Sequence, residues 1–163
     1  MQSDGAHSDP WNYVNSLHIG GLIAVGFPDD EHLLCVSCSG RGLYKLKTGE
    51  RVARDYLEPT EGGWFADDNM SAEGIGSCAG QRFSVAGLWG GTVWLATRDH
   101  YQLKLRTANG QIEDGWLISP EGIASRLPLH NVTENRVITF SPNGEWLIVA
   151  TSSEVGLLRR EAL

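Results

Sequence analysis

Residues 137–160 of the chain read VITFSPNGEWLIVATSSEVGLLRR, three apolar runs separated by short polar breaks. The first break, Ser-Pro-Asn-Gly at 141–144, has the composition of a tight turn, because Pro presets its own φ and Asn and Gly accept positive φ. Short apolar runs bounded by turn residues are typical of buried β-strands. The stretch therefore predicts an antiparallel β-meander.

The same order of apolar run, turn and apolar run occurs twice more, beginning near residues 22 and 83. The second unit is expected to contain strands at 83–88, 92–97, 101–107 and 111–118. Within it, YQLKLR at 101–106 alternates with the period of a half-buried strand, and Asn109-Gly110 is a hairpin turn signal. Because no segment keeps a helical period, we predict an all-β fold of three antiparallel, blade-like meander units in a single domain of residues 1–163.

The segments around these units carry weaker signals. Residues 10–18 have the length of one or two helical turns, and PEGIASRLPL at 120–129 reads as a short helical turn stopped by Pro128. The third unit lacks a fourth strand, for which residues 16–19 are the candidate. The connections at 57–80 and 119–135 are expected to be irregular.

The stretches IAVGFPDDEHLLCVSCSGRGLYKLKTGERV and VITFSPNGEWLIVATSSEVGLLRR resemble blades of the WD-repeat β-propeller family: both have an SPDG-like turn after the first apolar run, and the first also has a TG turn, Thr48-Gly49. The resemblance implies blade-like sheets with a ring-closing N-terminal strand. Neither the Trp-Asp nor the Gly-His signature of that family is present, and closed propellers usually have at least four blades. The units are therefore expected to form an open or incomplete propeller-like or barrel-like assembly.

Composition bounds the class of protein. The hydrophobic fraction of 41% is that of a globular chain, and no basic and apolar N-terminal leader or membrane-length apolar run occurs. Three cysteines, Cys35, Cys38 and Cys78, fit a reducing compartment, in which they are expected to be small buried residues. The sequence thus favours a cytoplasmic protein with no membrane contact, no metal and no cofactor.

The net charge of −7 is concentrated in one part of the chain. Residues 55–81 contain six acids and no Lys or Arg, whereas acids and bases nearly balance elsewhere. A negative surface repels the phosphate backbone, so nucleic acid is excluded and a basic protein is favoured as partner. Apolar anchors within a ring of acids suit such a partner. The candidate partner-binding residues are Asp55, Glu58, Glu61, Trp64, Phe65, Asp67, Asp68, Met70 and Glu73.

Two interpretations of this segment remain open at the level of sequence. Trp64 and Phe65 either contact a partner or cover an open end of the β-assembly, with the acids simply solvated. The tryptophans at 89, 94, 116 and 146 lie in or beside strands and are expected in the core.

No catalytic motif is recognisable, so we expect a non-catalytic protein-binding module. Its most specific form is an inhibitor or immunity protein that neutralises a basic bacterial toxin, by analogy with small acidic proteins of that class. One alternative is a small ligand-binding or hydrolytic β-domain that uses Asp67, Asp68, Glu113 and Asp114. A second alternative is a self-associating scaffold subunit, for example a homodimer that completes the ring.

Overall fold

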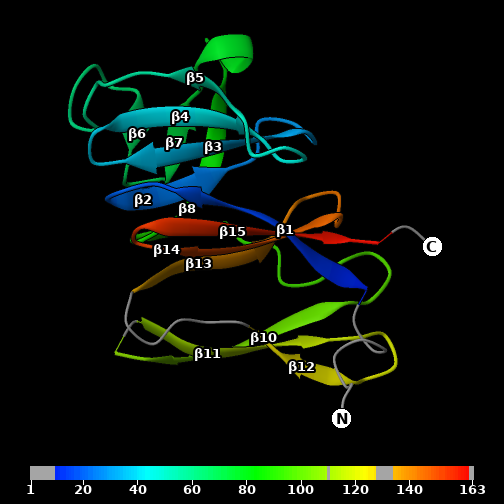
Figure 1. Ribbon diagram of the computed structural model, residues 1–163. Helices are drawn as coiled ribbons and strands as arrows, with labels where there is room; N and C mark the ends of the chain where they lie inside the picture. The colour runs from blue at the N-terminus through cyan, green and yellow to red at the C-terminus, as the bar shows by residue number, and fades with distance from the viewer. Residues whose placement is uncertain (1–9, 110, 128–133, 162–163) are drawn as a thin grey trace.

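Three antiparallel β-sheets make up the computed structural model, which describes residues 10–109, 111–127 and 134–161 (Figure 1). The predicted all-β class is confirmed. Within the described residues the helical element is one 3-10 turn, η1 (Gly76–Cys78). No helix in this part of the chain has the length and hydropathy that crossing a membrane requires.

A four-stranded sheet forms the middle layer in Figure 1. Its strand order is β1 (Trp11–His18), β15 (Glu154–Arg160), β14 (Trp146–Thr151) and β13 (Asn135–Phe140). Every residue of β14 is buried, and its side chains alternate between two apolar clusters, with Trp146 and Ile148 in one and Leu147 and Val149 in the other. A sheet covered on both faces requires such a continuous apolar run. This explains WLIVAT, the central part of the third sequence unit.

Strand β1 completes the middle sheet. It pairs with β15 over its whole length, with Leu17 opposite Val155 and Trp11 opposite Arg160. The prediction that residues 16–19 supply the missing fourth strand is confirmed, whereas the helical turn expected at 10–18 is wrong. Trp11 and Leu17 are buried in different clusters, and a register shift between Tyr13 and Asn15 interrupts the alternation of the strand. This interruption hides the strand period in the sequence.

An eight-stranded, strongly curled sheet lies above the middle layer in Figure 1. Its order is β5 (Arg51–Arg54), β4 (Gly40–Lys45), β3 (His32–Ser37), β2 (Leu22–Gly26), β8 (Arg82–Gly87), β7 (Ser71–Glu73) and β6 (Phe65–Ala66), with β9 (Gly90–Gly91) paired to β8. The strands β2 to β5 are the first sequence unit, whose meander is confirmed. Leu33 and Cys35 face the middle sheet, while Leu34 and Val36 face the inside of the curl.

The second unit does not form one sheet, so its predicted boundaries are wrong. Strand β8 pairs with β2 instead, and residues 92–97 make only isolated bridges, from Trp94 to Phe140 and from Ala96 to Gln102. Glycines allow the close approach of β2 and β8: a Cβ on Gly87 would lie 1.9 Å from the carbonyl oxygen of Ile23. The first run of the second unit therefore extends the sheet of the first unit.

The third sheet, below the middle layer in Figure 1, contains β10 (Gln102–Ala108), β11 (Gln111–Ile118) and β12 (Ala124–Arg126). The predicted hairpin of β10 and β11 is confirmed, and Leu103 is buried against the middle sheet. The helical turn expected at 120–129 is wrong over its described part, because Ala124–Arg126 pairs with β11. Residues 128–133 lie outside the described residues.

The three cysteines differ in their exposure to solvent. Cys35 and Cys78 are buried, as expected, but Cys38 is exposed in the turn that follows β3. Among the described residues no three His, Cys, Asp or Glu side chains gather as metal ligands.

Candidate protein-binding surface

One arginine contacts both ends of the acidic segment, residues 55–73, which also contributes β6 and β7 to the curled sheet. Arg41 on β4 is 7% exposed, and its backbone N–H and Nε each donate to the Asp55 carboxylate at 3.0 Å. Its Nη2 also contacts Asp55, and its Nη1 donates to the carbonyl oxygen of Glu73 at 2.7 Å. Arg41 thus holds both ends of the segment, and the negative charge of Asp55 is neutralised within the fold.

Two of the predicted apolar contacts lie beneath the surface. Trp64 and Met70 are 2% and 5% exposed and belong to the apolar cluster inside the curl. The Trp64 indole donates to the Glu58 carbonyl oxygen at 3.1 Å, and the Arg41 guanidinium lies 4.4 Å from its ring centroid. These two side chains anchor the segment from inside, so any partner contact depends on the residues around them.

The remaining acids of the segment face solvent. Glu58, Glu61, Asp67 and Asp68 are exposed, and Glu73 is half-buried. None of the five carboxylates forms an ion pair within the described residues; that of Glu61 accepts a backbone N–H of Glu58 at 3.0 Å.

Outside the segment, six of the twelve described acids pair with Lys or Arg, and two more contact a histidine that is charged only when protonated. The pairs are Asp29 with His32, Glu50 with Lys45, Asp99 with Arg160, Glu113 and Asp114 with Arg106, Asp114 with Arg126, Glu134 with Arg136, Glu145 with Arg159, and Glu154 with His18. Asp30, Glu31, Glu121 and Glu161 also lack an ion pair among the described residues, but the segment contains six acids and no Lys or Arg.

An aromatic pair lies beside these acids. Half-buried Phe65 packs on Trp64 at 5.9 Å and on Trp89 at 6.2 Å between ring centroids. Trp89 is 54% exposed and its neighbour Leu88 is 41% exposed. The expectation that Trp89 belongs to the core is wrong, because it occupies the tip of the tight hairpin between β8 and the two glycines of β9. Its position directly before Gly90-Gly91 is the sequence signal for this exposure.

We define the acidic surface as Glu58, Glu61, Phe65, Asp67, Asp68 and Trp89. It combines carboxylates that have no ion pair among the described residues with the exposed Trp89 and the half-buried Phe65, next to the buried Trp64 and Met70. Large exposed aromatics are typical anchors of interfaces, and exposed acids accelerate encounter with a basic protein.

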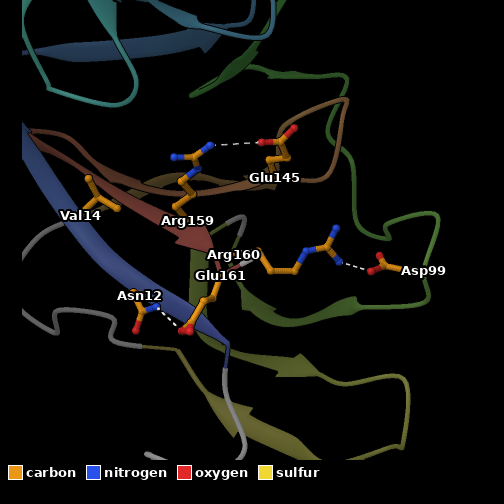
Figure 2. A pocket seen from close by; sticks show the side chains of 7 residues that line it. All are labelled: Asn12, Val14, Asp99, Glu145, Arg159, Arg160 and Glu161. Atoms are coloured by element: carbon orange, nitrogen blue, oxygen red, sulfur yellow. Dashed lines mark hydrogen bonds and ion pairs between the residues drawn. The ribbon is translucent and has the colours of Figure 1, made fainter. Parts of the chain in front are cut away.

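A polar groove of about 670 Å³ lies where β1 and β15 end, and Figure 2 shows the residues around it. Each of its arginines has an acidic partner: Arg159 contacts Glu145 at 3.5 Å, and Arg160 contacts Asp99. The third acid, Glu161, accepts a hydrogen bond from Asn12 at 3.4 Å. Burial opposes ionisation of Asp99, but a hydrogen bond from Thr97 and the Arg160 charge bring its pKa below the ordinary value. Paired charges of this kind connect the strand ends to the neighbouring turns.

The four acids of the hydrolytic alternative do not form one site. Asp67 and Asp68 lie between β6 and β7 in the curled sheet, whereas Glu113 and Asp114 lie on β11 at the other end of the stack in Figure 1. A hydrogen bond from Arg126 to Asp114, 2.9 Å from Nε to Oδ1, lowers the pKa of that carboxyl. Asp114 is therefore an ionised structural group at neutral pH.

Comparison of the chain with protein-family models, with curated proteins and with solved structures gives no match. The assignment of function therefore depends on the geometry of the surface alone.

Proposed function

We propose that this protein is a non-catalytic module that binds a basic protein partner on its acidic surface. The observation that carries the proposal is the local concentration of unpaired charge. Glu58, Glu61, Asp67 and Asp68 are exposed without an ion pair among the described residues, in a segment that contains no Lys or Arg, whereas half of the described acids elsewhere pair with Lys or Arg. Unpaired surface charge costs folding energy through self-repulsion, and a partner of opposite charge relieves it. The adjacent Phe65 and Trp89 supply apolar contact area.

An inhibitor that neutralises a basic toxin is the most specific form of this proposal. Such an inhibitor needs rapid association, which complementary charge provides, and a rigid surface, which limits the entropy lost on binding. The contacts of Arg41 with Asp55 and Glu73 and the buried Trp64 supply that rigidity.

A second part of the proposal concerns the relation of the fold to β-propellers. We propose that the meanders β2–β5, β10–β12 and β13–β15 act as stacked blades of an incomplete propeller-like assembly. Their face-to-face packing around a middle sheet completed by β1 supports this proposal.

The test compares two charge reversals of equal size at opposite ends of the stack. Asp67→Lys changes the acidic surface, and Glu121→Lys changes an exposed residue of the turn between β11 and β12. Proteins of the source cell that bind the immobilised wild type are identified, and their association rates are measured against both variants over a range of salt concentrations.

A basic partner should associate at least about tenfold more slowly with Asp67→Lys, with a flatter salt dependence, and at the wild-type rate with Glu121→Lys. An association rate that is equal for both variants would remove the acidic surface as the contact. The double variant Asp67→Lys, Asp68→Lys should slow association further.

A further inference from the structure

A small, positively charged pocket lies on the face of the curled sheet that is turned away from the interior of the curl. Its volume is about 110 Å³, and its polar lining includes Arg51, Arg54, Tyr44, Ser39 and His18. Pockets for drug-sized molecules have about 300–1,000 Å³, so this one suits a single small group. Among the described residues no Asp or Glu lines it, although Glu154 lies 3.7 Å from His18 at the rim.

A β-bulge brings the two arginines together. In the register of β4 with β5, Gly42 faces Arg54 and Leu43 faces Ala53, but the next residue, Tyr44, faces Arg51. Side chains three positions apart on a regular strand point to opposite faces. The extra residue, Val52, reverses this relation, so that Arg51 and Arg54 line the same pocket.

The two guanidinium groups have no acidic partner. Neither Arg51 nor Arg54 forms an ion pair within the described residues. Arg54 is held in place by hydrogen bonds to the carbonyl oxygen of Arg41 at 3.1 Å and to the Ser39 hydroxyl at 3.2 Å, and it stacks on Tyr56 at 4.4 Å. In a chain of net charge −7, two close arginines without a counter-ion form a distinct positive site.

Tyr44 adds a hydroxyl donor at the wall. Its ring lies over Gly42, where a Cβ would be 2.7 Å from Tyr44 Cε1 and 2.9 Å from the hydroxyl oxygen. Burial raises the pKa of the Tyr44 phenol, against the effect of the nearby Arg51 and Arg54 charges. The phenol therefore keeps its proton at neutral pH and can donate a hydrogen bond.

We propose that this pocket binds one phosphate-sized oxyanion, either free phosphate or the phosphate group of a small molecule. The planar guanidinium fork matches the oxygen spacing of phosphate, and charge-assisted hydrogen bonds to it are strong. The pocket faces away from the interior of the curl that Trp64 and Met70 fill, so it is independent of the acidic surface and of its partner.

The experiment is a titration with inorganic phosphate at constant ionic strength, followed by the amide NMR signals of Gly20, Ser39 and Gly42. Wild-type protein should show saturable shifts at these amides. Arg51→Gln removes an exposed pocket arginine and should weaken phosphate binding roughly tenfold or more. Tyr44→Phe removes one hydroxyl and should weaken it less. Arg98→Gln, which removes an exposed arginine elsewhere, should bind phosphate like the wild type.

Each contrary result is decisive. Equal phosphate affinity of Arg51→Gln, Tyr44→Phe and Arg98→Gln would overturn the proposal. Uniform shifts that do not saturate would mean an adventitious ion only and would overturn it as well. A parallel titration with acetate separates the anions: tighter binding of acetate would assign the pocket to a carboxylate and reject phosphate. Phenyl phosphate in a third titration shows whether the anion is free or carried by a larger molecule.

Discussion

The acidic surface and the polar groove of Figure 2 are both rich in charged side chains, but they differ in how many of these side chains form ion pairs. In the groove, Arg159 and Arg160 each contact a carboxylate from a neighbouring turn. On the acidic surface, Glu58, Asp67 and Asp68 are exposed with no ion pair among the described residues. Charged side chains that stabilise the fold have a partner of opposite charge nearby, whereas unpaired charged side chains are available to bind another protein. This difference supports the proposal that the acidic surface binds a partner, and it predicts that the groove contributes to stability.

The largest effect is expected at the base of the acidic surface. Arg41→Ala removes the guanidinium donors of the Asp55 carboxylate and of the Glu73 carbonyl oxygen, and it removes the cation from the Trp64 ring. Breaking a buried ion pair on one side costs about 3–5 kcal/mol. Urea denaturation should show a loss of about 3 kcal/mol, and hydrogen exchange should speed up in residues 55–73. Arg98→Ala is the control and should stay within about 0.5 kcal/mol of the wild type. Equal stability of the two variants would mean that Arg41 does not hold the segment.

A smaller loss is expected in the groove. Arg160 contacts Asp99 and lies 5.7 Å from the Trp11 ring and 5.4 Å from the Tyr101 ring. An exposed ion pair with cation–π contacts is worth about 1 kcal/mol, so Arg160→Ala should lower the unfolding free energy by that amount. A double-mutant cycle with Asp99→Asn measures the share of the ion pair. Binding of the proposed basic partner should not change, and a tenfold loss of affinity for it would contradict the distinction between the two regions.

At acidic pH, the stability of the protein should depend on Asp99, one of the ion-paired residues of the groove. The pKa of Asp99 is lower in the folded chain than its ordinary value. The unfolded chain therefore binds the proton more readily, and the stabilisation by Asp99 is complete above the ordinary aspartate pKa of about 3.9 and is lost as pH falls through the folded value. Asp99→Asn should flatten the stability curve of the protein in this acidic range and leave its slope near neutral pH unchanged. An identical acid slope in both proteins would refute the role of Asp99.

The smallest effect on stability is expected from the acidic surface itself. Asp67→Lys with Asp68→Lys changes two exposed side chains without ion pairs among the described residues. Such surface substitutions usually change the unfolding free energy by less than about 0.5 kcal/mol each. The same urea titration, at low and high salt, measures this change. A loss of several kcal/mol would make these acids structural, like those of the groove.

The first and third meanders could be predicted from sequence because their signals are local. Each combines apolar runs with a turn such as Ser141-Pro-Asn-Gly144, and β14 carries an apolar face on both sides. The sequence could not show that the strands of the second unit belong to different sheets, because β8 pairs with β2, a strand about sixty residues earlier in the chain. The seam depends on glycines such as Gly87, whose role becomes visible only when the opposing carbonyl is known.

The position of the exposed acids was also predictable, since it follows from an uneven charge distribution. The neutralisation of Asp55 by Arg41 was not, because it depends on the register between β4 and β5. The sequence left open whether Trp64 faces a partner or covers the β-assembly, and the curl of the sheet encloses it. The exposure of Trp89 is contrary to expectation, because the β8–β9 hairpin holds it at the surface. The bulge that gathers Arg51 and Arg54 has no recognisable sequence signal.

The pairing of β1 with β15 also constrains how the molecule is made. Asn12 and Glu161, which meet across this pair, are 149 positions apart, so the middle layer cannot close until the residues between them have left the ribosome. During synthesis, the apolar side chains of β2 and β3 that pack on the middle sheet stay exposed until that sheet forms. Long-range pairing of this kind slows folding and prolongs exposure of sticky surface. Assembly of the nascent chain should therefore depend on the last strand, and a ribosome-stalled chain that ends before β15 should recruit holding chaperones.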